Sequence, residues 1–154
     1  MAASNTPRRK MPTAITVVNL QKRIPLQIQS ILKAAQTILH HEGIRAGELS
    51  IVFVTDSRIK SLNKKYLNED HPTDVLSFGN DNFGINSKQV SGEIIISTDT
   101  AVKNARIYHV TPHREILLYV AHGILHLLGY DDQRDSDTRQ MRRKEQTLMN
   151  LISK

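Results

Sequence analysis

The segment from Thr111 to Gly129 constrains the fold more than any other part of the chain, because it predicts a long helix with little polar surface. Thr111 and Pro112 give a strong helix start, a capping residue followed by proline at the first helical position. Apolar residues then recur at spacings of three and four until Gly129, which predicts the helix end. A helix that is apolar on most of its surface is buried. We therefore expect this helix in the core.

The rest of the chain mixes short β-branched runs with amphipathic stretches. We expect a loop over residues 80–89, and the mixed order of elements favours an α+β or mixed α/β fold. The expected strands span residues 14–20, 49–55, 75–78 and 92–97. One further helix is expected to begin near Pro25, and three more are expected over residues 57–67, 100–108 and 136–152.

Composition narrows the possible chemistry. The 154 residues suit one domain and include no cysteine, so any metal must be bound by His, Asp or Glu. The net charge of +6 favours polyanionic partners such as nucleic acid. No apolar run approaches the roughly 20 residues that span a bilayer, so we expect no membrane partner.

The first 41 residues contain six Lys or Arg residues and no acidic residue; Glu42 is the first. Such a composition occurs in organelle transit peptides. Only residues 1–12 resemble a tail, however, and folded-type sequence begins at about residue 14. We interpret residues 1–12 as a mobile basic tail on a cytoplasmic protein, and residues 13–154 as a single domain.

His122 and His126 form a candidate metal-binding pair. Residues four apart on a helix lie on one face, so both imidazoles can reach one divalent ion. Gly129 then lets the chain turn back and deliver a third ligand. Six residues after the second histidine, where metzincin peptidases have their third ligand, this chain has Asp132. Three ligands leave a position for water, although a histidine pair on an apolar helix can also serve packing or capping without a metal.

Gly123 argues against a peptidase. In the metzincin pattern the residue after the first histidine is a glutamate that acts as the general base. Here that position is Gly123, so the proton acceptor of peptidase chemistry is missing.

Three segments resemble the YbeY family of bacterial metal-dependent endoribonucleases. They are H-G-I-L-H-L-L-G-Y-D-D (residues 122–132), P-T-D-V-L-S-F (residues 72–78, preceded by Leu62, Asn63 and Tyr66) and G-E-I-I-I-S (residues 92–97). The match runs in order through residues 15–150. The resemblance implies an α+β fold, with a small mixed sheet of about four strands, packed helices and a metal site in a cleft at a C-terminal helix and turn.

The same resemblance implies the function. Family members hydrolyse single-stranded RNA, act in maturation of the small-subunit ribosomal RNA 3′ end, and serve in ribosome quality control. The implied ligands are His122, His126 and Asp132, the implied metal is zinc, and no side chain is assigned as the catalytic group, which is expected to be metal-bound water. Asp74 and Ser77 are expected in the cleft. The expected partners are single-stranded RNA, ribosomal RNA and the ribosome, with no small-molecule cofactor.

Two departures from the family pattern bear on this expectation. Asp132 replaces a third histidine, and its carboxylate oxygen is a harder ligand than an imidazole nitrogen. The site is therefore more tolerant of the hard ions Mn²⁺ and Mg²⁺. The alternative role for the neighbouring Asp131 is to support a ligand residue without binding the metal itself. Leu67 replaces an arginine that follows the family's tyrosine, and leucine cannot bind a phosphate.

Three hypotheses follow for the function. The first is the metal-dependent endoribonuclease, with Lys60, Lys64 and Lys65 as candidate RNA-binding residues, although these lysines also fit a solvated helix face. The second is an RNA-binding ribosome-assembly factor with a weak or structural metal and little catalysis. The third is a zinc peptidase.

Overall fold

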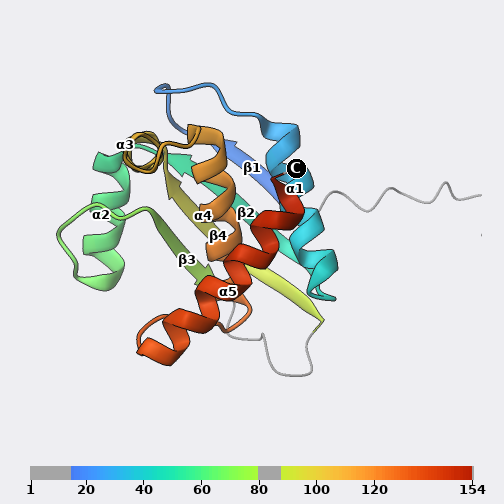
Figure 1. Ribbon diagram of the computed structural model, residues 1–154. Coiled ribbons are helices and arrows are strands. Elements are labelled where there is room, and N and C mark those ends of the chain that lie inside the picture. The colour runs from blue at the N-terminus through green and yellow to red at the C-terminus, as the bar shows by residue number, and fades with distance from the viewer. Residues whose placement is uncertain (1–14, 80–87, 154) are drawn as a thin grey trace, which may run out of the picture.

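The computed structural model describes residues 15–79 and 88–153 (Figure 1). The predicted tail (residues 1–12) and residues 80–87 of the predicted loop lie outside the described residues. The described chain forms strands β1 (Ile15–Asn19), β2 (Arg45–Val54), β3 (Val75–Gly79) and β4 (Gln89–Ser97), and helices α1 (Ile28–His41), α2 (Asp56–Leu67), α3 (Thr98–Tyr108), α4 (Pro112–Leu127) and α5 (Asp135–Ile152).

The strands form one mixed sheet in the order β1-β2-β4-β3. β1, β2 and β4 run parallel, whereas β3 is antiparallel to β4, with Val75 opposite Ile96 and Gly79 opposite Gly92. The predicted α+β fold with a small mixed sheet is therefore confirmed. β3 is an edge strand, and it contacts α4.

Helices cover both faces of the sheet. The main core lies between the sheet and helices α1, α4 and α5, and Figure 1 shows α4 and α5 crossing in front of the strands. A smaller cluster on the other face joins Ile59 of α2 to Val54, Leu76 and Ile95 of three strands. α4 is central, as the sequence predicts, because most of its side chains are buried. Within the described residues, no helix combines the length and apolar character needed to cross a membrane.

Two strands are longer than predicted. β2 begins at Arg45 rather than residue 49, and β4 begins at Gln89 rather than residue 92. Arg45 and Ala46 pair with Gln89 and Val90, and an irregularity between Ala46 and Leu49 separates these pairs from the main register. The polar, glycine-containing sequence at these two strand starts does not predict a strand. Pairing with the neighbouring strand nevertheless forms one, because it overrides weak local propensity.

The helix starts follow local chemistry. The side chains of Thr55, Ser97 and Thr111 accept hydrogen bonds from backbone N–H groups at the starts of α2, α3 and α4. α1 begins at Ile28, three residues after Pro25, and the carboxamide of Gln21 holds the preceding turn through hydrogen bonds to the backbone of Arg23 and Ile24. The position of α4 over the sheet comes from its packing in the main core.

Candidate metal centre

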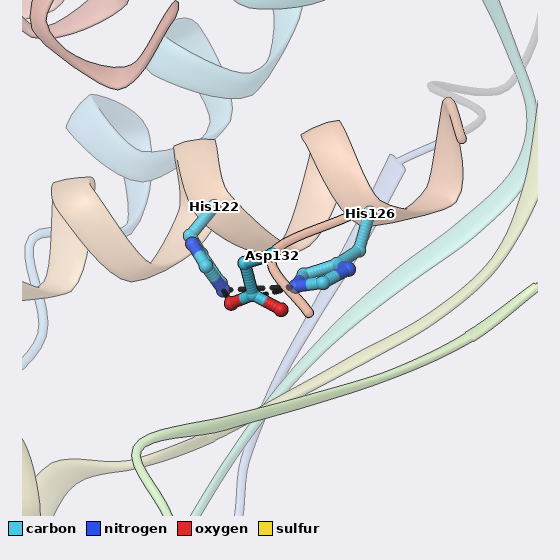
Figure 2. Close-up of side chains that lie close together, drawn as sticks. All are labelled: His122, His126 and Asp132. Atoms are coloured by element: carbon cyan, nitrogen blue, oxygen red, sulfur yellow. Dashed lines mark hydrogen bonds and ion pairs between the residues drawn. The ribbon is translucent and has the colours of Figure 1, made fainter. Parts of the chain in front are cut away.

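His122, His126 and Asp132 converge at the C-terminal end of α4 (Figure 2). The Nε2 atoms of the two histidines lie 3.0 Å apart. The Asp132 Oδ2 atom lies 3.7 Å from each of them. The structure thus brings together the three residues that the sequence predicts as ligands.

The turn after α4 positions Asp132. Gly129 has a φ of 99°, a backbone conformation that L side chains rarely adopt, and the N–H of Tyr130 donates to the Leu125 carbonyl. Two hydrogen bonds, at its N–H and at its carbonyl, then hold the backbone of Asp132. Its N–H donates to the Asp131 carboxylate at 2.7 Å, and its carbonyl accepts from the Thr138 hydroxyl at 2.9 Å. Asp131 therefore supports the turn, and the carboxylate of Asp132 faces the histidines.

Glu145 is a further member of the site that the sequence analysis missed. Its Oε2 lies 3.3 Å from Nδ1 of His122. An imidazole that donates from Nδ1 to a carboxylate presents its Nε2 lone pair to a metal. Met141, Glu145 and Met149 share one face of α5, and both methionines are buried. A charge on that apolar face is the signal in the sequence that could have identified Glu145.

The two histidines have different electrostatic surroundings. Burial lowers the pKa of His122, but the hydrogen bond and charge of Glu145, with the charges of Asp74 and Asp132, outweigh burial and raise it overall. The pKa of His126 is lowered, chiefly by burial and then by the charge of His122. Three nearby carboxylates therefore make the surroundings of His122 favourable for positive charge.

The geometry fits a divalent metal ion. In a tetrahedral zinc site with bonds of about 2.0–2.1 Å, ligand atoms lie about 3.3 Å from one another. The three separations here, 3.0, 3.7 and 3.7 Å, lie on both sides of that value. Two imidazole nitrogens and one carboxylate oxygen are also a donor set that zinc accepts. These residues can therefore hold one ion after small side-chain movements.

Gly123 faces the sheet, not the metal centre. A Cβ at this position would lie 2.6 Å from Cγ2 of Ile94, and the Gly123 carbonyl accepts a hydrogen bond from the Ser77 hydroxyl at 3.1 Å. A glutamate side chain has no room here. Packing against Ile94 therefore excludes the glutamate that a metzincin peptidase uses as its general base at this position. This disfavours the peptidase hypothesis.

The predicted RNA-binding lysines lie on α2, outside the metal cluster. Lys64 is paired with Asp70 at 3.6 Å, Lys65 lies 5.1 Å from the centre of the Tyr66 ring, and Lys60 is exposed. Leu67, at the end of the same helix, is 55% exposed and lines a hollow together with His126. This end of α2 therefore shares a hollow with a candidate ligand.

Two hollows adjoin the histidines. The first, which we call the His126 hollow, has a volume of about 360 Å³ and is lined by β3 residues including Ser77, by Leu67 and by His126. The second, which we call the His122 hollow, has a volume of about 440 Å³ and is lined by His122, Glu145, Asp74 and residues of α3 and α4. Asp74 and Ser77, both expected in the cleft, thus line different hollows.

Comparison with known proteins agrees with these observations. The family model described as Endoribonuclease YbeY matches residues 15–153. Proteins named Endoribonuclease YbeY include one from Syntrophus aciditrophicus, 33% identical over 93% of this chain and 92% of the relative, and one from Geobacter sulfurreducens, 36% identical over 90% and 95%.

The solution structure of TM1509 from Thermotoga maritima has a similar fold. Its TM-score is 0.66 and its identity 28%, with 90% of this chain and 88% of the other covered. The match to the family model extends over both sides of the sheet and through the metal centre. Because the family model and these relatives match nearly the whole described chain, this chain belongs to the YbeY endoribonuclease family.

Proposed function

We propose that this protein is a metal-dependent endoribonuclease that cuts single-stranded RNA, acting in the cytoplasm on the 3′ end of small-subunit ribosomal RNA and in ribosome quality control. The observation that carries the proposal is the convergence of His122, His126 and Asp132 with separations suited to one ion. Relatives that bear the name Endoribonuclease YbeY support the RNA substrate.

Different residues would hold the metal and orient its ligands. His122, His126 and Asp132 would hold the metal, and Glu145 orients His122 by accepting from Nδ1. A bound divalent ion supplies a Lewis acid for the phosphodiester and a water of lowered pKa. Zinc is the expected ion, with Mn²⁺ or Mg²⁺ as alternatives because Asp132 is a hard oxygen ligand.

Space and charge at the site suit a nucleic-acid chain. One hollow includes His122 and the other His126, so an RNA strand that passes the metal centre has room for a nucleotide on each side. The net charge of +6, to which Lys60, Lys64 and Lys65 contribute, favours a polyanion. The ribosome and its RNA are the partners that this proposal names.

Cleavage of a labelled single-stranded RNA tests the proposal, with the duplex of the same sequence in parallel. We expect the single strand to be cut, the chelator-treated protein to be inactive, and added zinc to restore cleavage. His122→Ala should abolish cleavage, whereas His40→Ala, at an exposed histidine on α1, should leave it unchanged. Cleavage that survives both the chelator and His122→Ala would refute the proposal.

The second candidate is an RNA-binding assembly factor with a weak or structural metal. The observation in its favour is Leu67, which presents an aliphatic side chain to the His126 hollow where the family pattern has an arginine. Under this alternative, a gel shift with the same labelled single strand shows tight binding, and the cleavage assay shows no products at any metal concentration.

A further inference from the structure

The His122 hollow has a lining that the metal centre does not explain. It lies between α3, α4 and α5, beside the start of β3, and its volume of about 440 Å³ is in the range of small-ligand sites. Besides His122 and Glu145, its polar and aromatic lining consists of Asp74, Asn104, Tyr108, Glu115, Tyr119 and Arg142.

Hydrogen-bond acceptors dominate this lining. The Asn104 amide donates to the Tyr119 hydroxyl at 2.8 Å, and the Glu115 carboxyl lies near enough to that hydroxyl to influence its pKa. Because Asn104 supplies its NH₂ group to the Tyr119 oxygen, the phenol O–H keeps its own proton for donation. This arrangement leaves the Asn104 carbonyl oxygen and a Glu115 oxygen as acceptors. Asp74 uses Oδ1 to accept from the N–H of Val75 at 2.8 Å, and it keeps a second oxygen.

Two other ligands fit this lining poorly. Within the described residues, one group of three acidic or histidine side chains can share an ion, and that group is the metal centre itself. The carboxylates of Asp74, Glu115 and Glu145 are therefore not arranged for a second metal. They also disfavour a phosphate by charge repulsion. The hollow is suited to a neutral group that carries hydrogen-bond donors.

A nucleobase with an amino group is such a donor. Cytosine and adenine carry NH₂ groups at the positions that carboxylates and amide oxygens recognise, whereas uracil has a carbonyl oxygen where cytosine has its amine. Tyr108 at the hollow's edge is 65% exposed and offers a ring for stacking. Arg142 is also exposed and supplies the cation for the backbone.

We propose that the His122 hollow is a nucleobase subsite, which binds the base beside the scissile phosphate and selects amino-bearing bases over uracil. The inference rests on the proposed function, because it takes single-stranded RNA as the ligand. It assigns Glu115, Asn104 and Asp74 as the acceptors that read the base.

Binding of two matched oligonucleotides tests the subsite. The probes are fluorescent 2′-O-methyl decamers of cytidine and of uridine, which resist cleavage, and the readout is fluorescence anisotropy with the zinc-loaded protein. Cytosine and uracil share one ring and differ chiefly at the group on C4. We expect the cytidine decamer to bind about tenfold more tightly, the equivalent of one modest base contact. Equal binding, or tighter binding of the uridine decamer, would overturn the inference.

Glu115→Gln tests the residue assignment. The amide replaces one acceptor oxygen by a donor, so the preference for cytidine should fall to threefold or less. Glu48→Gln makes the same change at an exposed position on β2 and should keep the full preference. An unchanged preference in folded E115Q would contradict the assignment. Because Glu115 is buried, thermal melting checks its fold, and the wild-type comparison decides the subsite whatever the variant does.

The outcome separates the subsite from the proposed function. If the protein prefers cytidine but cuts no RNA, the subsite stands and the endoribonuclease proposal fails. If it cuts unmodified cytidine and uridine oligomers equally and binds both decamers equally, the nuclease stands and the subsite fails.

Discussion

Asp132 has the most exposed side chain of the candidate metal centre, at 42% against 22% for His122 and 30% for His126. Its carboxylate adds negative charge and a hard oxygen, both of which lower the preference for zinc over harder ions. The identity of this single residue therefore affects the choice of metal more directly than the two half-buried histidines do.

Asp132→His should raise the affinity for zinc. An imidazole is a softer ligand than a carboxylate, and the turn at Gly129 already directs position 132 toward the histidines. Isothermal titration with zinc measures the change, and His126→Ala provides the control that should lose binding while staying folded. Unchanged or weaker affinity in the Asp132→His protein would show that position 132 is not a ligand.

Glu145→Ala should weaken zinc binding by about 10- to 100-fold, the usual effect of removing a carboxylate that orients a ligating histidine. Its Oε2 lies 3.3 Å from Nδ1 of His122, so the variant loses the group that fixes the ring. Glu48→Ala, at an exposed site on β2, is the matched control and should bind zinc normally. Equal affinities for the two variants would remove Glu145 from the site.

The ligand residues could be predicted from sequence because they lie within eleven residues of one helix and its turn. A spacing of four on a helix fixes a shared face, and Gly129 marks the reversal. Glu145 could not be placed in the same way. Its contact with His122 depends on how α5 packs against α4, and spacing along the chain does not specify that packing.

At the scale of elements, α4 and β4 meet closely at Gly123. A Cβ there would lie 2.6 Å from Cγ2 of Ile94, a group held by a β-branched side chain that is fully buried. This close contact sets the height of α4 above the sheet, and with it the position of His122 and His126.

Gly123→Ala should destabilise the fold by about 1–3 kcal/mol, the usual cost of overpacking a core, despite the better helix propensity of alanine. Urea denaturation measures the free energy of unfolding. In an Ile94→Ala background the clash disappears, so the same substitution should become neutral or stabilising. A loss of equal size in both backgrounds would show that Ile94 is not the obstacle.

His113 couples α4 to α1 and predicts a pH effect. Its Nε2 lies 2.9 Å from the Ser30 hydroxyl, and burial lowers its pKa. A lowered pKa means that folding favours the neutral imidazole, so its contribution to stability is present above the usual value of 6.5 and declines as the pH falls below it. His113→Gln should therefore lose less stability than the wild type between pH 7.5 and pH 5.5 in urea denaturation. Identical losses would contradict this assignment.

Helices were easier to predict than strand ends, for a physical reason. The starts of α2 and α4 depend on side chains that cap their own helix, so the information is local. The first residues of β2 and β4 pair with each other across 44 positions of sequence, as Arg45 does with Gln89. Their local sequence is polar and resembles a loop until the partner strand is known.

At the scale of the whole molecule, α4 packs between the sheet and α5, both helices cross in front of the strands in Figure 1, and α5 adds Glu145 to the metal centre. The order of strands and helices in the sequence predicts the class of fold, and the family resemblance predicts the mixed sheet. The two hollows beside the histidines could not be foreseen, since each is lined by elements distant in sequence.

Everything proposed for this site requires that His122, His126 and Asp132 together bind one divalent ion. A crystal of the protein soaked in zinc and measured at the zinc absorption edge tests it most directly. We expect one anomalous peak, about 2 Å from Nε2 of each histidine and from an Asp132 carboxylate oxygen. No peak at these three residues, or a peak bound elsewhere with the three side chains apart, would contradict it.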